Sequence, residues 1–361
     1  MADGPVRFGI IGCAEIARKV SRAISLAPNA SLYALASRSA DKAARFAADN
    51  GFPPSARIYG SYEALLDDPG VDAVYVPLPT SLHLRWAVAA ARKGKHLLLE
   101  KPVALNVAEL DQILAACDSS GVQFMDGTMW THHPRTAKMS EFLSDSQLFG
   151  ELKVMHANMT TNASPDFLKN NIRVNRDLDA LGALGDLGWY CVRAVLWAAD
   201  YDLPTTVVAM RGTVFHQSNG TILSCGASLH WPDGKVATFH CSFLANLTFN
   251  LTVVGTKGTL SLHDLVIPFE ESSASFYSNS GAGFTGLSTG TDPKPSPHTV
   301  AVDMPQEAHM VAEFARLVKS VKGKRAVPEK SWVALSRKTQ VVLDAVMASI
   351  EKGCDPVEVV Y

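Results

Sequence analysis

The sequence lacks several features that mark particular classes of protein. It has no run of about 20 apolar residues, the length that spans a bilayer, and no basic stretch precedes its first apolar run. Its six cysteines include no CxxC pair, which argues against zinc and favours reduced thiols. The net charge of −2 gives no drive toward nucleic acid. We therefore expect a soluble, cytoplasmic protein without a membrane, nucleic-acid or metal partner.

Short apolar runs alternate with helical stretches over the first 127 residues. The runs VRFGIIG, SLYALAS, VDAVYVPLP and HLLLE are expected to be strands, and amphipathic segments separate them. This alternation is typical of a parallel sheet with crossover helices. The chain of 361 residues is long enough for about two domains. The sequence thus predicts an α/β Rossmann domain over residues 1–127, which would bind NADP.

The remaining residues, 128–361, are rich in longer β-type runs joined by turn signals. They predict an α+β domain with an open, mostly antiparallel sheet, which would bind substrate and form a dimer. One helix is expected over 183–199, and two amphipathic helices near 306–320 and 331–351. Residues 271–298 are rich in Ser, Gly, Thr and Pro without periodicity, so a mobile surface loop or lid is expected there.

The first expected strand leads into the motif GIIGCAEIA. Of the three glycines of the dinucleotide-binding pattern GxGxxG only Gly12 is present, and Ala14 and Ala17 fill the other places. Small residues there let backbone N–H groups approach a pyrophosphate at a helix N-terminus. We predict a cofactor contact at Gly12, Ala14, Glu15 and Ile16; the alternative is a strand–helix turn without a ligand.

The second expected strand ends in Ser37 and Arg38. A carboxylate at this place would bind the ribose 2′-hydroxyl of NAD, whereas an arginine accommodates the 2′-phosphate of NADP. The pair therefore favours NADP, with NAD as the second choice. Alternatively, both residues belong to a solvated loop.

Lys101 follows a buried parallel strand in the run Glu100-Lys101-Pro102. Ligands of open α/β sheets bind at the carboxyl edge of the strands, where Lys101 is expected. Hydride transfer to or from a carbonyl carbon also moves a proton on or off the oxygen. The ammonium group of Lys101 can donate that proton and stabilise alkoxide charge. The alternative is a surface lysine before a turn proline.

Asp186 and Tyr190 are four residues apart in an expected helix, so they share one face. A neighbouring lysine lowers the pKa of a phenol and makes Tyr190 a candidate acid or base. Asp186 would then orient Lys101 or Tyr190. Whether the lysine or the tyrosine donates the proton stays open. Structural alternatives are a core aromatic for Tyr190 and a helix cap for Asp186.

The adjacent residues His132 and His133 are not predicted to hold a metal. Neighbouring residues on a strand face opposite ways, and no Cys or carboxylate lies at ligand spacing beside them. A polar contact is the favoured interpretation.

Five segments can be taken together: GIIGCAEIA, VDAVYVPLPTSLH, GKHLLLEKP, MWTHHP and GALGDLGWY. In order and spacing the chain resembles the glucose–fructose oxidoreductase/inositol dehydrogenase/MocA family, most of all its dimeric dihydrodiol dehydrogenase and D-xylose dehydrogenase branch. The resemblance implies an N-terminal Rossmann domain and a C-terminal open sheet whose face covers the nicotinamide. That face often forms a dimer interface in the family, so a homodimer is expected.

The resemblance also implies further cofactor contacts. Leu78, Pro79 and His83 would belong to a cofactor-lining stretch after the fourth strand. Glu100 and Lys101 would border the nicotinamide, Trp130 would lie near its ribose, and Arg173 would lie close to the active site. Two departures from the family pattern occur. The run between Trp130 and Pro134 has no arginine, and Tyr190 stands where many relatives have histidine, as in the dihydrodiol and xylose dehydrogenase branch.

These observations predict an NADP-dependent oxidoreductase. It would transfer a hydride between nicotinamide and the hydroxyl or carbonyl carbon of a sugar, polyol or vicinal diol. One alternative is a carbonyl or imine reductase of specialised metabolism. Another is an NADP-binding regulator without catalysis. The substrate and the physiological direction stay open.

Overall fold

The structure is a computed structural model that describes residues 4–286, 290–324 and 326–361. The chain forms two compact units. The first comprises Met1–His132 and Met304–Arg337, and the second comprises His133–Asp303 and Lys338–Tyr361. In the described ranges, no helix is both long and apolar enough to cross a membrane.

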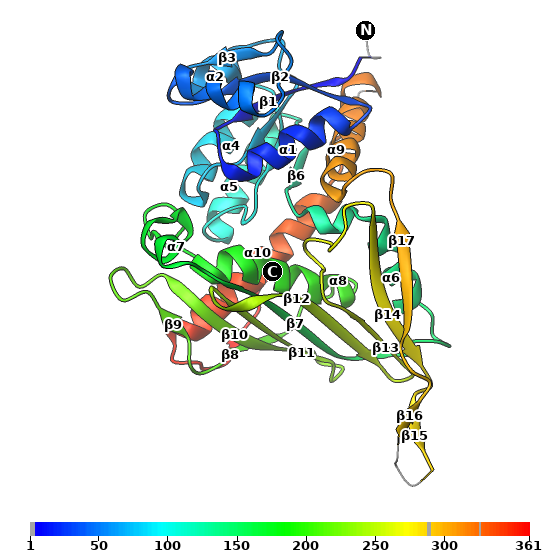
Figure 1. Ribbon diagram of the computed structural model, residues 1–361. Helices are drawn as coiled ribbons and strands as arrows, with labels where there is room; N and C mark the ends of the chain where they lie inside the picture. The colour runs from blue at the N-terminus through cyan, green and yellow to red at the C-terminus, as the bar shows by residue number, and fades with distance from the viewer. Residues whose placement is uncertain (1–3, 287–289, 325) are drawn as a thin grey trace. The chain divides into compact units, whose positions relative to one another are not determined.

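The first unit contains a six-stranded parallel sheet with the strand order β3-β2-β1-β4-β5-β6 (Figure 1). The strands are β1 (Val6–Ile11), β2 (Ala30–Ala36), β3 (Arg57–Tyr59), β4 (Ala73–Val76), β5 (His96–Leu99) and β6 (Phe124–Asp126). Every residue of β4 and β5 is buried, which explains their unbroken apolar runs. The order reverses between β1 and β4, as in a Rossmann sheet. The predicted fold of this half is confirmed.

Helices connect these strands. They are α1 (Glu15–Leu26), α2 (Ala40–Asp49), α3 (Tyr62–Asp67), α4 (His83–Arg92) and α5 (Val107–Ser119), with short 3₁₀ turns η1 (Thr80–Leu82) and η2 (Met129–His132). Three helices begin at side-chain caps: the side chains of Ser39, Ser61 and Asn106 accept hydrogen bonds from N–H groups of the first turn.

Helix α9 (Gln306–Lys324) belongs to the first unit although it follows the second sheet in the chain. It packs beside α1, and Phe314 contacts Phe8 of β1 with ring centroids 5.9 Å apart (Figure 1). The compact units therefore differ from the sequence division at residues 127 and 128. A sequence pattern shows where a helix lies along the chain but not the core to which it returns.

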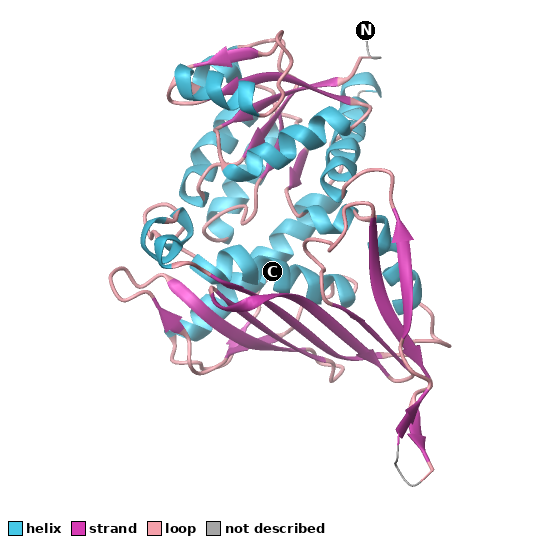
Figure 2. Cartoon of the chain, viewed as in Figure 1, coloured by secondary structure: helices cyan, strands magenta, loops and turns pink. Residues whose placement is uncertain are grey.

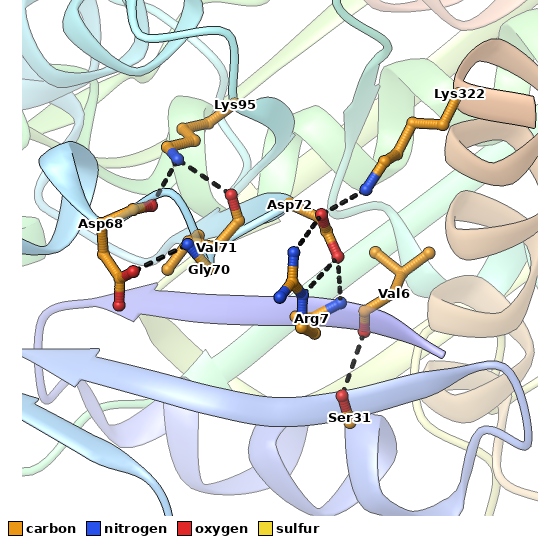
Figure 3. Close-up of polar contacts among 9 residues, drawn as sticks. All are labelled: Val6, Arg7, Ser31, Asp68, Gly70, Val71, Asp72, Lys95 and Lys322. Atoms are coloured by element: carbon orange, nitrogen blue, oxygen red, sulfur yellow. Dashed lines mark hydrogen bonds and ion pairs between the residues drawn. The ribbon is translucent and has the colours of Figure 1, made fainter. Parts of the chain in front are cut away.

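A charged cluster fixes α9 at the amino edge of the first sheet (Figure 3). Asp72 accepts two hydrogen bonds from the Arg7 guanidinium, at 3.0 and 3.1 Å, and pairs with Lys322 of α9. Burial raises the pKa of the Asp72 carboxyl, but the bonds from Arg7 and Lys322 outweigh it and lower that pKa to about 2. Nearby, Lys95 donates to the carbonyl oxygen of Asp68 at 2.6 Å. The cluster ties three sequence-distant segments together.

The buried His96 of β5 predicts a loss of stability in acid. Burial lowers the pKa of His96 to about 4, and its Nδ1 accepts the N–H of Gln123 at 2.9 Å, which requires the neutral ring. The unfolded pKa is about 6.5, so the stability is fully present above that pH and is lost as the pH falls through 4. This histidine alone should lower the free energy of unfolding by about 3 kcal/mol over that window.

Urea unfolding at pH 7 and pH 4.5 checks this prediction. His96→Asn keeps an acceptor for Gln123 without a titrating ring, so between the two pH values its unfolding free energy should fall by about 3 kcal/mol less than that of the wild-type protein. His263→Asn, at an exposed position, is the control and should retain the wild-type pH dependence. A His96→Asn variant with the wild-type slope would contradict the explanation.

The second unit is built on an open mixed sheet with the order β17-β14-β13-β12-β7-β11-β10-β8-β18, and β9 pairs with β10. Its strands are β7 (Leu152–Asn162), β8 (Thr206–Ala209), β9 (Val214–Phe215), β10 (Ile222–His230), β11 (Val236–Ser242), β12 (Leu244–Gly255), β13 (Gly258–Leu262), β14 (Ser273–Ser280), β17 (Ser296–Ala301) and β18 (Val357–Glu358). Strands β7 and β11 pair in parallel, whereas the other described pairings are antiparallel. The predicted sheet type is confirmed.

The second unit also contains helices, several of which pack against its sheet (Figure 2). They include α6 (Pro134–Leu143), α7 (Pro165–Asn170), the 3₁₀ turn η3 (Ile172–Val174), the π-helical turn η4 (Leu184–Gly188) and α8 (Trp189–Ala198). The helix expected over 183–199 is thus present as η4 and α8. The two C-terminal helices are also confirmed, as α9 and as α10 (Ser331–Glu351), which crosses from the first unit to the second at Arg337.

The loop or lid expected over residues 271–298 is wrong. Most of this segment forms β14, the start of β17 and a separate hairpin of β15 (Gly283–Thr285) and β16 (Gly290–Asp292); residues 287–289 lie outside the described part. Alternate side chains of β14, Ala274, Phe276 and Ser278, are buried. The period of two was hidden because serine fills many positions on both faces of β14.

Candidate active site

The predicted cofactor residues of the first unit gather at one edge of its sheet. Gly12, Ser37, Leu78 and Lys101 follow the carboxyl ends of β1, β2, β4 and β5, and parallel strands end at a common edge. Arg38, Pro79 and Glu100 also follow the ends of β2, β4 and β5. The other predicted residues lie at the start of α1, at the start of α4 and in η2 after β6: Ala14, Glu15, Ile16, His83 and Trp130.

The turn after β1 requires glycine. Gly12 has φ +112, and a Cβ built on it would lie 2.9 Å from Leu78 Cδ2. Ala14 is the N-cap of α1, and no side chain caps the first N–H groups of this helix. A pyrophosphate fits such a terminus because uncapped N–H groups and the helix dipole both favour an anion. The turn therefore suits a dinucleotide despite its two alanines.

Four polar groups meet beyond the end of β2. Ser37 is buried, and its hydrogen bond opposes the rise that burial causes in the pKa of Cys13. Burial likewise raises the pKa of Tyr62, and the exposed Arg38 guanidinium opposes it. Sequence patterns gave no role to Cys13 or Tyr62, although Cys13 directly follows Gly12. The group places a cation and hydroxyl donors where a ribose phosphate would lie.

His83 links two loops of the same edge. Its side chain is 1% exposed, and its ring nitrogens lie 2.8 Å from the carbonyl oxygen of Leu78 and 3.2 Å from that of Val103. Burial lowers the pKa of His83 to about 4, so the ring is neutral at pH 7. His83 thus supports the loops after β4 and β5 through their backbones.

Glu100 and Lys101 stand at the end of β5. The Glu100 carboxylate accepts a hydrogen bond from the Tyr75 hydroxyl at 2.5 Å and another from the Lys101 backbone N–H at 3.1 Å. Glu100 is 8% exposed, and Lys101 is partly exposed. Tyr75 was missed from sequence; the available signal was a hydroxyl within a strand buried on both faces, because such a group needs a partner.

In the second unit an ion pair joins two predicted site residues. Arg173 Nε lies 3.0 Å from Asp186 Oδ2. Attraction by the Asp186 carboxylate raises the pKa of Arg173 above its usual value, and Asp179 and Tyr190 act in the same direction. Arg173, Asp186 and Tyr190 are therefore neighbours. Asp186 lies in the π-helical turn and Tyr190, which is 5% exposed, in the first turn of α8. Turns of this type are frequent at functional sites.

The glycines of the run GALGDLG bring this turn close to the sheet. Gly182 has φ +57, and a Cβ on it would lie 2.2 Å from the carbonyl oxygen of Ile222 in β10. A Cβ on Gly188 would lie 3.3 Å from Cys241 Sγ in β11. The motif is therefore glycine-rich because of packing, and that packing sets the position of Asp186.

His132 and His133 lie where η2 ends and α6 begins, not on a strand as was expected from the sequence. His132 ends η2 and stacks on Trp332 with ring centroids 4.8 Å apart. His133 is the N-cap of α6, and its Nδ1 accepts the N–H of Arg135 at 2.9 Å. Within the described ranges, no group of three or more His, Cys, Asp or Glu could hold a metal.

Comparison with known proteins decides the family. Residues 6–128 match the oxidoreductase family with an NAD-binding Rossmann fold, GFO/IDH/MocA, and residues 138–261 match the GFO/IDH/MocA C-terminal domain. An uncharacterized oxidoreductase of Rhizobium meliloti is 32% identical over 355 residues, which are 96% of this chain and 98% of that protein. The chain belongs to the GFO/IDH/MocA family of oxidoreductases. It is therefore an NAD(P)-dependent dehydrogenase or reductase, as the sequence predicted.

Relatives with known reactions cover most of the chain. A dTDP-3,4-didehydro-2,6-dideoxy-alpha-D-glucose 3-reductase of Actinomadura kijaniata is 32% identical over 73% of this chain and 76% of its own. A trans-1,2-dihydrobenzene-1,2-diol dehydrogenase of Bos taurus is 29% identical over 72% and 74%. Among solved structures, a 3-ketoreductase of Actinomadura kijaniata in complex with NADP and TDP-benzene superposes with a TM-score of 0.82 and 27% identity, covering 96% of this chain and 98% of that one.

Proposed function

We propose that this family member is an NADP-dependent enzyme that interconverts a hydroxyl and a carbonyl group of a sugar, polyol or vicinal diol. The observation that carries the proposal is the carboxyl edge of the first sheet, where Gly12, the Ser37–Arg38 pair and Lys101 follow the ends of β1, β2 and β5. The relatives support the substrate class, because a keto-sugar reductase and a dihydrodiol dehydrogenase both act on carbon that bears oxygen.

We assign the two segments the roles that the sequence predicted. Residues 1–127 would hold NADP, and residues 128–361 would bind substrate and form a homodimer through the open sheet. When bound, nicotinamide supplies the hydride chemistry. The pyrophosphate would lie at the start of α1, and Arg38 would bind the 2′-phosphate. NADP is favoured because Ser37 and Arg38 occupy the place where NAD-selective sites carry a carboxylate.

Lys101, Asp186 and Tyr190 would move the proton. The Lys101 ammonium donates to the substrate oxygen during reduction, or the Tyr190 phenol does so with Lys101 favouring its phenolate. Lys101 belongs to the first unit and the other two residues to the second, so their joint action is part of the proposal. The ion pair with Arg173 gives Asp186 a fixed orientation, and Asp186 would then orient Tyr190.

Replacing Arg38 with glutamine should weaken NADPH binding by about tenfold or more, since charge-assisted hydrogen bonds contribute about 1.5–3 kcal/mol each. NADH binding should change little because it lacks the 2′-phosphate. Dissociation constants for both cofactors, measured by fluorescence titration, check the prediction. Arg45→Gln, at an exposed position of α2, is the matched control. Equal losses for NADH and NADPH would contradict the assignment of Arg38.

The substrate class is tested by a panel of aldoses, keto-sugars, vicinal diols and aromatic carbonyls, each supplied with NADPH or NADP⁺. Cofactor absorbance reports turnover. Turnover with sugars or diols supports the proposal, whereas activity confined to simple carbonyls or imines would favour the second enzyme class considered from sequence.

A further inference from the structure

The Glu100 carboxylate is held from the β4 side by a buried phenol. Tyr75 is fully buried in β4, and its hydroxyl lies 2.5 Å from Glu100 Oε1. The other carboxylate oxygen, Oε2, accepts the N–H of Lys101 at 3.1 Å. Hydrogen bonds to an ionised group are shorter and about twice as strong as neutral ones. Two such bonds, on different oxygens, fix the rotation of the carboxylate as well as its position.

A glycine closes the β6 side of the same carboxylate. Gly127 follows β6, and its N–H donates to the carbonyl oxygen of Leu99 at 2.8 Å, which extends the pairing of β5 and β6 by one residue. A Cβ built on Gly127 would lie 2.9 Å from Glu100 Oε1 and 3.2 Å from its Cδ. Any other side chain would therefore push the carboxylate from this place. Glu100 is thus confined between neighbouring strands.

The position of Glu100 in the sheet explains why a fixed carboxylate would matter for the cofactor. A dinucleotide bound across the point where strand order reverses has its adenosine half beside β1 and β2, where Ser37 and Arg38 lie. The nicotinamide half then faces the ends of β4, β5 and β6, and Glu100 follows β5 directly. Oxidised nicotinamide carries a positive ring charge and reduced nicotinamide does not. A fixed anion beside the ring therefore favours the oxidised form, since opposite charges attract strongly where water is excluded.

We propose that Tyr75 and Gly127 are positioning residues that hold the Glu100 carboxylate at one point beside the nicotinamide, and that this fixed charge makes the site bind NADP⁺ more tightly relative to NADPH. The inference rests on the proposed cofactor site at this sheet edge. Neither residue touches the reacting atoms; both act through Glu100.

Binding of the two cofactor forms tests this without any substrate. The ratio of the dissociation constant of NADP⁺ to that of NADPH is measured by titration calorimetry for the wild-type protein and for Glu100→Gln, Tyr75→Phe and Gly127→Ala. Removal of the charge in Glu100→Gln should raise the ratio on the order of tenfold. Tyr75→Phe releases one oxygen and Gly127→Ala displaces it, so each should raise the ratio about threefold.

Matched controls separate positioning from general damage. Tyr33→Phe removes a hydroxyl from β2, and Gly60→Ala adds a Cβ that meets the Cβ of Ala40 at an ordinary 3.5 Å. Both should keep the wild-type ratio. Melting temperatures of all variants show whether they fold, and a Tyr75→Phe protein that does not fold leaves Gly127→Ala as the test.

The outcomes distinguish this inference from the proposed function. Wild-type ratios in both Tyr75→Phe and Gly127→Ala, together with a raised ratio in Glu100→Gln, would overturn the positioning role and leave the cofactor site intact. An unchanged ratio in Glu100→Gln would overturn the role of the fixed charge. A wild-type protein that binds neither cofactor form would overturn the proposed function and this inference with it.

Discussion

Replacing Lys101 with methionine should reduce turnover by about 10² or more, the usual effect of removing a group that transfers a proton. Methionine keeps the length of the side chain but removes the ammonium, so the substrate oxygen loses its donor and the stabilisation of its charge. NADPH binding should persist, because the turn at Gly12 that would hold the pyrophosphate and the Arg38 side chain that would bind the 2′-phosphate are untouched. Steady-state kcat with the best substrate of the panel, together with a fluorescence titration of NADPH, measures both effects.

Three further variants make the result specific. Lys93→Met, at an exposed position where the lysine pairs with Asp67, is the matched control and should keep wild-type kcat. Lys101→Arg keeps the charge but cannot release a proton near pH 7, so it should recover little activity if proton transfer is the role. Tyr190→Phe then shows which group donates: a loss as large as that of Lys101→Met indicates the phenol. Wild-type turnover in Lys101→Met would contradict the role of Lys101 in proton transfer.

Replacing Asp264 with alanine should destabilise the second unit by about 3–5 kcal/mol, the range for breaking one partner of a buried ion pair. Arg135 of α6 is 1% exposed, and its Nη1 lies 2.5 Å from Asp264 Oδ1 and 2.9 Å from the carbonyl oxygen of Ser275. Burial lowers the pKa of Arg135, which shows that its charge is costly to keep in this place. Without the carboxylate the guanidinium is left charged and buried.

Urea unfolding followed by circular dichroism measures this loss. Glu141→Ala is the control. It removes a carboxylate from α6, the helix of Arg135, where Glu141 pairs with Lys138 at the surface. Exposed pairs contribute only about 0–1 kcal/mol. A difference of several kcal/mol between the two variants is expected. A loss below about 1 kcal/mol for Asp264→Ala would show that the pair is not a main support of the fold.

The Rossmann domain could be predicted because its strands and helices are recognisable from consecutive residues of the sequence. Strands buried on both faces must be apolar throughout, and β4 and β5 therefore stand out in the sequence. Strand β17 did not stand out, since it is exposed along most of its length and carries Pro297, which an edge strand tolerates. The return of α9 to the first sheet was also hidden, because the contact of Phe314 with Phe8 joins residues far apart in the chain.

Some residues of the candidate site could likewise be predicted from the sequence, and others could not. Gly12 and Lys101 could be proposed from motifs whose local geometry explains them. The bond between Tyr75 and Glu100 crosses from one strand to the next, and the pairing of Arg173 with Asp186 depends on where η3 and η4 meet. Such contacts follow from tertiary packing, which spacing along the chain does not encode.

The central claim is that the protein transfers a hydride between NADP(H) and oxygen-bearing carbon, with Lys101 in the proton path. The most direct test follows cofactor absorbance with NADPH and NADP⁺ across the panel of sugars, diols and carbonyls, for the wild-type protein and Lys101→Met side by side. The account predicts turnover of at least one sugar or diol by the wild-type protein, and a loss of about 10² or more in the variant. Tight NADPH binding without turnover of any panel member, or equal turnover by both proteins, would contradict it.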